Sequence, residues 1–461
     1  MSQADITLVN VSTAVPCGEG GAREAYLPLG CLYLVAALER SGIEVEFRDY
    51  QLRSLEVERS LNVDSLVEFM DGSARIIGIS CMVSMLPLVL LATKRLKELD
   101  PERTIVLGGP GPSGVAEPIM RSMPWIDVVA RGEGEETIVP LVRAIMKGAS
   151  LASVEGITYR EGAAVQRMPS RKRIRDLDAL GFPAYSRADV GAYANISIVS
   201  GRGCPYRCGF CDVGPLWENK TVFRGMEGVI AELRLLKETY GISRVHVADD
   251  TFDLRRDRAE SFCAEVAGLG INWTCLSRID LLDEKLLETM AKAGCDAIFL
   301  GIESGSDAVL RRINKRFTIE EGTEKVALST RFIPKVVTSF IWGFPFETME
   351  DFKSTVFSVV SMWHLGAMAG LKLLSPMPLS PFGVEYSDRL RFDEDLCSVF
   401  ASLGNEGPEK TALRAGIPEE FATIIRQFPD VFAGFYHIEH EGLREKASYL
   451  RKFSEKRGIR I

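Results

Sequence analysis

The stretch that decides the second half of the chain is Ile196-Ser-Ile-Val-Ser-Gly-Arg-Gly-Cys204-Pro-Tyr-Arg-Cys208-Gly-Phe-Cys211-Asp. A short apolar run of strand length is followed at once by three cysteines with the spacing C-x3-C-x2-C. Because cysteine thiolates hold iron–sulfur clusters, three of them on one loop can bind three irons of a four-iron cluster. The next cysteine, Cys263, is too distant to serve the fourth iron. An open metal position is typical of catalytic rather than structural metal sites.

A zinc site is the main alternative reading of this loop. Zinc sites normally show paired C-x2-C units or histidines at regular spacing from them. The chain has four histidines, and none is paired in this way with the three cysteines: His246, His364, His437 and His440. The pattern therefore favours a cluster over zinc.

Alternating strand and helix patterns continue from this loop. Strands are predicted at 196–200, 243–248, 272–276, 297–301, 336–341 and 371–374. Helices are predicted between them at 228–239, 257–268, 284–293, 319–330 and 349–365. Six such β/α units suit a partial (β/α)6 barrel over residues 193–382, and in such folds the chemistry lies at the carboxyl ends of the strands.

The same alternation occupies residues 1–150 and predicts a parallel sheet covered on both faces, a doubly wound, Rossmann-like domain. Residues 151–192 break the rhythm with a small hairpin and a proline-containing connector, and are predicted to be a linker. Residues 383–461 are mostly helical and charged, and could cover a substrate. The predicted fold class is α/β throughout the first two domains.

Composition narrows the range of functions. The 461 residues carry a formal net charge of -8, which argues against a general nucleic-acid partner. No stretch approaches the ~20 apolar residues of a membrane span, and the N-terminus lacks the pattern of a signal peptide. We therefore expect a cytoplasmic protein whose ten cysteines are reduced or bound to metal.

The cysteine loop resembles the signature of the radical S-adenosylmethionine superfamily, C-x3-C-x-aromatic-C, with Phe210 at the aromatic position. In that family the open iron chelates the amino and carboxylate groups of the methionine moiety. The resemblance extends over about residues 195–375 and implies roles for residues at successive strand ends. The implied ligands of S-adenosylmethionine are Asp249 and Asp250 for the amino group, Ser277 and Arg278 for the carboxylate side, Glu303 and Ser304 for the ribose side, and the backbone of Ile341 and Gly343 for the adenine.

The first 150 residues resemble the cobalamin-binding domain that precedes the radical core in many family members. Four segments carry this resemblance, at 27–38, 78–84, 107–113 and 131–137. They contain glycine-rich or small-residue turns, which let backbone amides approach a bulky cofactor at the sheet edge. The implied cobalamin contacts are Leu29, Ser80, Met82, Ser84, Gly108, Gly109, Pro110, Gly132, Glu133 and Gly134.

One departure from the best-known cobalamin domains concerns the cobalt ligand. Those domains carry D-x-H-x-x-G, whose histidine coordinates cobalt, whereas residues 1–200 contain no histidine. This domain cannot supply an imidazole to cobalt, as in several methylating members of the family. The alternative is a domain that has lost cobalamin and serves as a scaffold.

The resemblance implies a cobalamin-dependent C-methyltransferase with a [4Fe-4S] cluster. One S-adenosylmethionine would methylate cobalamin, and a second would give a 5′-deoxyadenosyl radical that activates an unactivated carbon for methylation. Cyclisation, ring contraction or rearrangement with the same cofactors is a close alternative. A methylthiotransferase, with Cys17, Cys31 and Cys81 on a second cluster, and a non-catalytic electron carrier are further alternatives.

The substrate is not determined by the sequence, and a small molecule, a lipid or a peptide would all be compatible with it. Tyr386 and His364 are candidate catalytic residues in the cavity. An electron donor such as flavodoxin or ferredoxin is expected as a partner.

Overall fold

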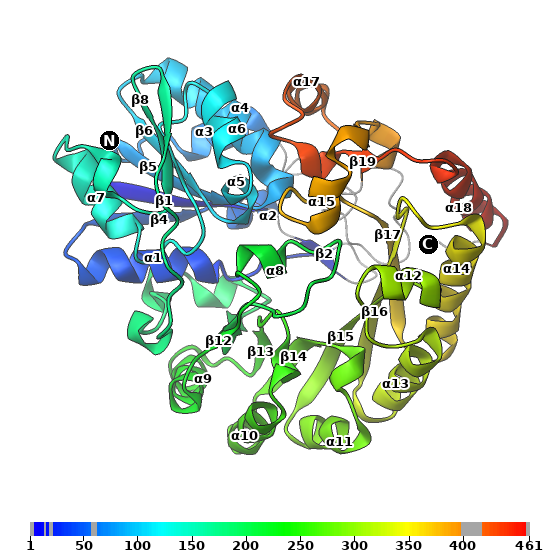
Figure 1. Ribbon diagram of the computed structural model, residues 1–461. Coiled ribbons are helices and arrows are strands. Elements are labelled where there is room, and N and C mark those ends of the chain that lie inside the picture. Colours follow the sequence, from blue (N-terminus) through cyan, green and yellow to red (C-terminus); the bar gives the residue numbers. More distant parts are fainter. Residues whose placement is uncertain (1–3, 13–14, 18–21, 57–61, 398–416, 458–461) are drawn as a thin grey trace. The chain divides into compact units, whose positions relative to one another are not determined.

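A computed structural model describes residues 4–12, 15–17, 22–56, 62–397 and 417–457. The chain divides into two compact units (Figure 1). Unit 1 comprises residues 1–194 and 416–433, and unit 2 comprises residues 195–415 and 434–461. No helix within the described ranges is both long and apolar enough to cross a membrane.

Unit 1 is built on a seven-stranded sheet with the order β4-β1-β5-β6-β7-β8-β9. The first five strands in this order are parallel to one another. The last two pairings, β7 with β8 and β8 with β9, are antiparallel. The strands are β1 (Ile6–Val11), β4 (Val45–Asp49), β5 (Ile76–Cys81), β6 (Thr104–Gly108), β7 (Val128–Ala130), β8 (Ile157–Glu161) and β9 (Ala164–Arg167). A separate short ribbon pairs β2 (Val15–Cys17) with β3 (Ala22–Glu24).

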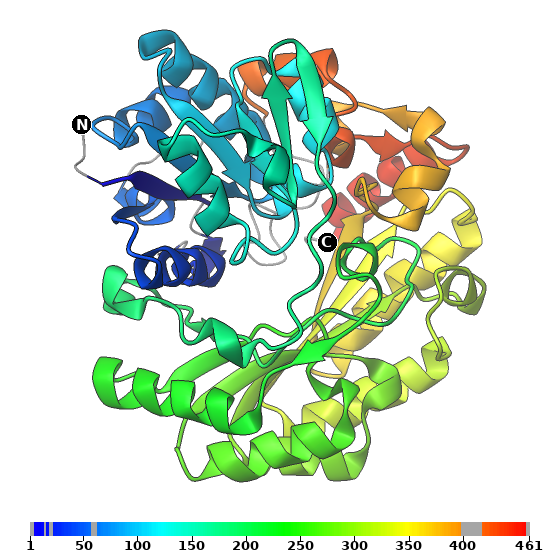
Figure 2. The ribbon, with the colours of Figure 1, turned by 60° about the vertical axis from the view of Figure 1, so that its left-hand side comes forward.

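Helices cover both faces of this sheet (Figures 1 and 2). Their bounds are α1 (Leu29–Arg40), α2 (Tyr50–Glu56), α3 (Val63–Phe69), α4 (Leu86–Leu99), α5 (Pro110–Ser113), α6 (Ala116–Ser122) and α7 (Ile138–Met146). One core joins Leu8 and Val106 of the sheet to Leu38 of α1 and Leu141 of α7. The predicted doubly wound domain is thus confirmed.

Two segments belong to unit 1 beyond the predicted range of 1–150. The hairpin β8–β9 pairs with β7 and extends the sheet, so this part of the predicted linker is an integral pair of strands. Helix α17 (Glu419–Gln427) also belongs to this unit, although it lies in the predicted C-terminal cover. The hairpin joins unit 1 through long-range strand pairing, and α17 joins it through packing against the unit. Neither contact is visible in the local sequence pattern.

Unit 2 contains a six-stranded parallel sheet with the order β10-β13-β14-β15-β16-β17, which confirms the predicted partial barrel. The strands are β10 (Ser197–Ile198), β13 (Arg244–Val247), β14 (Asn272–Ser277), β15 (Cys295–Glu303), β16 (Lys335–Trp342) and β17 (Met368–Leu373). The helices that follow them are α9 (Met226–Tyr240), α10 (Arg256–Ala267), α11 (Glu284–Lys292), α13 (Ile319–Phe332) and α14 (Met349–His364).

The remaining elements of unit 2 lie between these strands and helices or follow β17 in the chain. They are β11 (Gly201–Arg202), α8 (Val213–Leu216), β12 (Val222–Phe223), α12 (Asp307–Arg312), α15 (Pro381–Glu385), β18 (Leu390–Arg391), β19 (His437–Ile438) and α18 (Leu443–Arg457). Capping boxes start two of the long helices, Thr318 with Glu321 at α13 and Thr348 with Asp351 at α14.

The two faces of the six-stranded sheet differ in burial. Side chains of the outer face pack on the helices, as Trp273 does on Phe262 and Trp342 on Phe352, with ring centroids 5.0 and 5.7 Å apart. Side chains of the inner face are half-buried or exposed, as in β16, where Lys335, Val337, Ser339 and Ile341 alternate with buried residues. The strand alternation therefore directs one set of side chains into the core and the other toward the site.

Candidate functional site

The cysteine loop follows β11 and is held by backbone contacts on both sides. The amide of Gly209 donates to the carbonyl of Ile313 at 3.3 Å, and the amide of Phe382 donates to the carbonyl of Gly209 at 2.8 Å. A Cβ on residue 209 would stand 2.3 Å from the ring of Phe382, so glycine is required there. The side-chain amide of Asn314 also donates to the carbonyl of Arg207 at 2.9 Å. The loop is thereby fixed between the end of α12 and the start of α15.

Asp249 holds the backbone that leads into this loop. Its carboxylate is 3% exposed and accepts hydrogen bonds from the amides of Ser200 and Gly201 and from the Ser200 hydroxyl, at 2.7, 2.9 and 2.6 Å. The carboxylate of Asp250 accepts from the amide of Gly203 at 2.8 Å. The resemblance assigned these two residues to the methionyl amino group. In the structure both carboxylates bind the backbone that precedes Cys204.

The three thiols of the loop lie close to one another. Cys208 is buried, and Cys204 and Cys211 are partly exposed. Burial raises the pKa of Cys211 to about 12, and its proximity to Cys208 and Cys204 contributes to the rise. The sulfur of Cys204 lies 3.6 Å from the hydroxyl of Thr251. This donor set fits an iron–sulfur cluster, in which each sulfur binds its own iron.

A site for a single metal ion is a different arrangement. Within the described ranges, no three His, Cys, Asp or Glu side chains converge as ligands of one ion.

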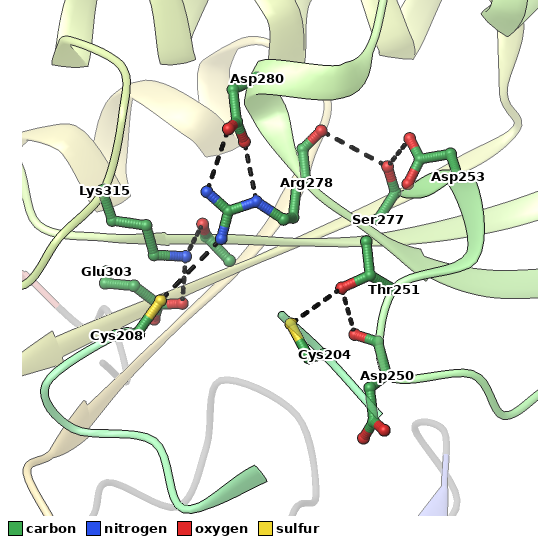
Figure 3. A network of polar contacts seen from close by, with 11 residues as sticks. Cys204, Cys208, Asp250, Thr251, Asp253, Ser277, Arg278, Asp280, Glu303 and Lys315 are labelled. Carbon is green, nitrogen blue, oxygen red and sulfur yellow. Dashed lines mark hydrogen bonds and ion pairs between the residues drawn. The ribbon is translucent and has the colours of Figure 1, made fainter. Parts of the chain in front are cut away.

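Arg278 places a positive charge beside this loop. Its Nε and Nη2 donate to the two carboxylate oxygens of Asp280 at 2.9 and 3.1 Å, and its Nη1 lies 3.9 Å from the sulfur of Cys208 (Figure 3). The guanidinium also stacks 3.5 Å from the centroid of the Tyr206 ring. Because two of its nitrogens are committed to Asp280, the guanidinium is fixed with Nη1 toward the cysteine loop.

Glu303 and Lys315 form a buried ion pair at the end of β15. The Lys315 ammonium donates to Glu303 Oε1 at 3.1 Å and to the carbonyl of Gly301 at 2.8 Å (Figure 3). The Ser339 hydroxyl donates to Glu303 Oε2 at 3.3 Å. Lys315 also lies 5.9 Å from the ring centroid of Phe210, the aromatic residue of the cysteine motif. The pair is therefore adjacent to the cysteine loop.

Sequence reasoning missed Lys315, Asp280 and Tyr206. Lys315 follows a six-residue helix and the left-handed residue Asn314, with φ of 64°, so its spacing from β15 follows no strand or helix period. Tyr206 lies inside the quoted motif, but its stacking on Arg278 depends on the tertiary fold.

Ser277 and Asp253 form a second buried polar pair at the end of β14. The Ser277 hydroxyl donates to Oδ2 of Asp253 (Figure 3). Oδ1 of Asp253 is buried without a hydrogen-bond partner in the described residues. Burial raises the pKa of Asp253 to about 6. A buried acceptor without a partner is what a ligand donor at this strand end would satisfy.

Two other predicted ligands of S-adenosylmethionine face the protein itself. Ser304 is fully buried, and its hydroxyl lies 3.1 Å from that of Thr355 on α14. The amide of Gly343 donates to the carboxylate of Glu347 at 2.9 Å, and its φ is 84°. Ile341 lies on the inner face of β16, half-buried. Packing of α14 against the strand ends determines these orientations.

The structure separates the two catalytic candidates. Tyr386 follows α15, and its ring lies 6.1 Å from that of Phe382, which packs on Gly209 of the cysteine loop. His364 is exposed in the last turn of α14, four residues before β17 begins at Met368. It therefore lies before β17, at the amino ends of the strands and away from the cysteine loop, whereas the chemistry of such folds lies at the carboxyl ends.

In unit 1 the loops after β5 and β6 approach each other closely. A Cβ on Gly109 would stand 2.8 Å from the Ser80 hydroxyl oxygen, and one on Gly111 would stand 2.8 Å from the backbone of Met82. Gly109 also has a φ of 90°, a conformation that favours glycine. The two predicted segments 78–84 and 107–113 are thus brought together at the carboxyl edge of the sheet.

Other predicted cobalamin contacts line or adjoin this edge. Within the part of the chain that the structure describes, a Cβ on Gly108 or Gly132 would meet no atom within 4 Å, and Met82 is 52% exposed. This edge therefore offers open and apolar surface that fits a bulky cofactor. Leu29 begins α1, Ser84 lies in the turn before α4, and Pro110 begins α5.

The segment after β7 faces a different neighbour. Glu133 accepts a hydrogen bond from the amide of Ile174 at 2.9 Å, so its carboxylate binds the connector. Gly134 packs against Leu34 of α1.

Cys31 and Cys81 of the first domain are buried. Burial raises the pKa of both Cys31 and Cys81 to about 12. The sulfur of Cys31 lies 4.0 Å from Oδ1 of Asn10. The side-chain amide of Asn10 donates a hydrogen bond to Asp49. The side chain of Cys17, the third cysteine of the methylthiotransferase alternative, lies outside the described residues.

Comparisons with known proteins match both halves of the chain. The model of the radical SAM superfamily matches residues 198–359, and that of the B12 binding domain matches residues 22–142. An uncharacterised methyltransferase of Pyrococcus horikoshii is 33% identical over 340 residues, which are 71% of this chain and 72% of the relative. An anaerobic magnesium-protoporphyrin IX monomethyl ester cyclase of Rubrivivax gelatinosus is 29% identical over 64% of this chain and 55% of its own length.

A solved structure shows the same fold. It is the radical S-adenosylmethionine methyltransferase TsrM of Kitasatospora setae, with tryptophan substrate and an S-adenosylmethionine analogue bound. The match has a TM-score of 0.65 and 20% identity, and covers 83% of this chain and 76% of that one. Together with the two family models and the relative at 33% identity, it confirms the resemblance. The chain belongs to the radical S-adenosylmethionine enzymes with a cobalamin-binding domain, whose cofactors are a [4Fe-4S] cluster, S-adenosylmethionine and cobalamin.

Proposed function

We propose that this enzyme is a C-methyltransferase that methylates an unactivated carbon of a small molecule, a lipid or a peptide. The proposal rests on one observation: the same chain contains a loop of three thiols held by backbone hydrogen bonds and a sheet edge lined by glycines. When bound, the cofactors supply a radical derived from S-adenosylmethionine and a transferable methyl group. The methyltransferase from Pyrococcus horikoshii supports methyl transfer as the outcome.

The residues of unit 2 have distinct tasks in this proposal. Cys204, Cys208 and Cys211 hold the cluster. Arg278 and Lys315 supply positive charge for the carboxylate of S-adenosylmethionine, because both lie beside the cysteine motif. Two buried carboxylates would complete the ligand set. Asp253, whose Oδ1 has no partner among the described residues, would accept from the amino group, and Glu303, held by Ser339, would bind the ribose.

The tasks of unit 1 are binding and exclusion of water. Backbone groups of Gly108, Gly109 and Gly132 would approach the corrinoid, and Met82 would cover it. Because residues 1–200 contain no histidine, the domain supplies no imidazole to cobalt. In this proposal residues 1–150 form the cobalamin domain, 193–382 the radical core and 383–461 a substrate cover. Flavodoxin or ferredoxin would supply the electron.

A second candidate function is cyclisation or rearrangement with the same cofactors. The similarity to the cyclase of Rubrivivax gelatinosus favours it. The two candidates differ in what becomes of S-adenosylmethionine, since only methyl transfer converts it to S-adenosylhomocysteine.

The test is a product analysis of the anaerobically purified enzyme, reduced with titanium(III) citrate and supplied with S-adenosylmethionine, cobalamin and an anaerobic cell extract. Methyl transfer predicts S-adenosylhomocysteine and 5′-deoxyadenosine together, whereas cyclisation predicts 5′-deoxyadenosine alone. Metal analysis of the same preparation should give about four irons and one cobalt per chain. If an enzyme loaded with both metals formed neither product, both candidate functions would be contradicted.

A further inference from the structure

The inner face of the unit 2 sheet carries an ordered pattern of side chains across four strands. Leu276, Phe299, Val337 and Met368 are paired in register from β14 to β17 and form one continuous apolar row. Phe299 is 38% exposed and Met368 is 49% exposed. Large apolar side chains left exposed in a row are typical of a binding surface.

The next row toward the carboxyl ends is small and open. Gly301, Ser339 and Gly370 are paired in register across β15, β16 and β17. Glu303 and Lys315 lie over Gly301 and Ser339, whereas a Cβ on Gly370 would meet no atom of the described residues within 4 Å. Among the described residues, the side chains of Glu303 and Lys315 therefore fill the space above the apolar row beside β15, and no atom fills it beside Gly370 of β17.

Lys372 stands at the top of the open side. It is paired with Ile341 in the third row and lies on the same face as Gly370 and Met368. Its side chain is exposed and makes no hydrogen bond or ion pair with any residue that the structure describes. Its surroundings nevertheless lower the pKa of its ammonium by partial desolvation. A partly desolvated cation without a counter-ion is positioned to bind an anion.

From this geometry we propose that Lys372 binds an anionic group of the substrate, a carboxylate or a phosphate, while the apolar row binds an aromatic or aliphatic body. This inference rests on the proposed function, and it narrows the substrate to an amphipathic anion. Met368 and Lys372 are four residues apart on β17, a span of about 13 Å, which accommodates a ring system between them. β17 is two strands, about 10 Å, from β15 with its Glu303–Lys315 pair, so the anion site is separate from the proposed site for S-adenosylmethionine.

The test uses 1-naphthyl phosphate as the anionic probe and 1-naphthol as its neutral counterpart. Equilibrium dialysis would measure their binding to the anaerobically reconstituted holoenzyme with S-adenosylmethionine and no reductant. Lys372→Met should weaken 1-naphthyl phosphate about tenfold or more and leave 1-naphthol unchanged, because only a charge-assisted hydrogen bond is lost. Lys372→Arg should retain most of the affinity, and Phe299→Ala should weaken both probes.

Lys335→Met is the matched control, because Lys335 is exposed on the same face at the amino end of β16. It should leave both probes unchanged. Absence of saturable binding to the wild-type enzyme, or equal effects of Lys372→Met on both probes, would overturn the inference. A parallel loss of S-adenosylmethionine affinity in Lys372→Met would assign the lysine to the cofactor and overturn it as well. Cluster content and S-adenosylmethionine cleavage, measured separately, report on the proposed function itself.

Discussion

Glu303 has a left-handed backbone conformation, with φ of 77°, although it carries a full side chain. Such a conformation is strained for residues other than glycine and persists only where surrounding contacts fix it. Here the ion pair with Lys315 and the hydrogen bond from Ser339 fix the side chain. The strain therefore accompanies a carboxylate that is held at the strand end beside the cysteine motif.

The Lys315–Glu303 pair gives the first prediction. Lys315→Met should destabilise the fold by about 3 kcal/mol, because it leaves a buried carboxylate without its cation. It should also weaken S-adenosylmethionine binding at least tenfold, while the absorption spectrum of the cluster is retained. Adding Glu303→Gln should restore most of the stability but not the affinity. Calorimetric unfolding and equilibrium dialysis would separate the two effects.

Lys292→Met is the control for this pair, since it breaks an exposed ion pair of 2.8 Å with Glu288 on α11. Exposed pairs of this kind contribute about 0.5 kcal/mol or less, so neither stability nor affinity should change much. Recovery of full affinity in the double variant would contradict the role of Lys315 at the cofactor.

Asp249 gives the second prediction, which concerns the cysteine loop. Oδ1 accepts both backbone amides and Oδ2 accepts the Ser200 hydroxyl, so asparagine can replace it with its amide donating to that hydroxyl. Asp249→Asn should therefore keep the iron content. Asp249→Ala leaves two buried amides without acceptors and should cost about 2–4 kcal/mol and most of the bound iron. Equal iron content in the two variants would contradict the role of Asp249 in holding the cysteine loop.

The third prediction concerns pH. Burial raises the pKa of Asp249 and of Asp253 to about 6, whereas an unfolded aspartate ionises near pH 4. The folded protein therefore retains protons that the unfolded chain releases between about pH 4 and 6, and its stability falls as pH rises through this window. For each carboxyl the loss is at most about 3 kcal/mol. Urea unfolding of the metal-free protein should show Asp249→Asn and Asp253→Asn gaining stability over wild type toward pH 6, and a constant difference would refute this.

Individual site residues could be predicted only in part from the sequence. The cysteine loop is a local motif, and in the structure Cys204 and Cys208 lie near enough to Cys211 to contribute to the rise of its pKa. Asp249 and Ser304 occupy the expected strand ends, but their side chains turn to Ser200 and to Thr355, residues 49 and 51 positions away. Lys315 belongs to the site through an ion pair across 12 residues of turn and helix. Such choices among partners depend on packing, which the sequence does not display.

At the scale of elements, periodicity predicted most of both sheets. Alternating apolar runs and amphipathic helices place β13 to β17 within a few residues of their observed bounds. The sequence predicts the hairpin β8–β9 but places it in a linker, whereas its first strand pairs with β7 and extends the sheet of unit 1. No local pattern indicates that long-range pairing. Helix α17 has the amphipathic pattern of any surface helix, and only the tertiary structure assigns it to unit 1.

The close approach of the β5 and β6 loops gives the fourth prediction. Gly109→Val would place a branched side chain against the Ser80 hydroxyl and the Cys81 carbonyl, at a φ that valine rarely adopts. The loops should separate, and the cobalt content should fall severalfold, while the iron content stays unchanged. Gly162→Val is the control, because Gly162 has a φ of 60° at the tip of the β8–β9 hairpin and no described atom within 4 Å of its Cβ position. Equal cobalt in both variants would place the corrinoid elsewhere.

At the scale of the whole molecule, the two cofactor sites are built from separate sequence ranges. Every predicted cobalamin contact lies between Leu29 and Gly134, in unit 1, and every proposed cluster ligand lies between Cys204 and Cys211, in unit 2. Each unit has its own sheet and its own buried core. We therefore expect each unit to load its cofactor without the other, and the complete reaction to need both.

This expectation gives the fifth prediction, a crossed analysis of two variants. Cys208→Ala should lose iron, sulfide and all 5′-deoxyadenosine but bind cobalt as wild type does, because no residue of unit 1 is changed. Gly109→Val should show the reverse, with normal iron and continued 5′-deoxyadenosine formation, but little S-adenosylhomocysteine. Cys263→Ala controls for the loss of a buried thiol on α10, away from the loop, and should keep both metals. Loss of cobalt from Cys208→Ala would show that the units load together, and retained cleavage by an iron-loaded Cys208→Ala enzyme would refute the cluster assignment.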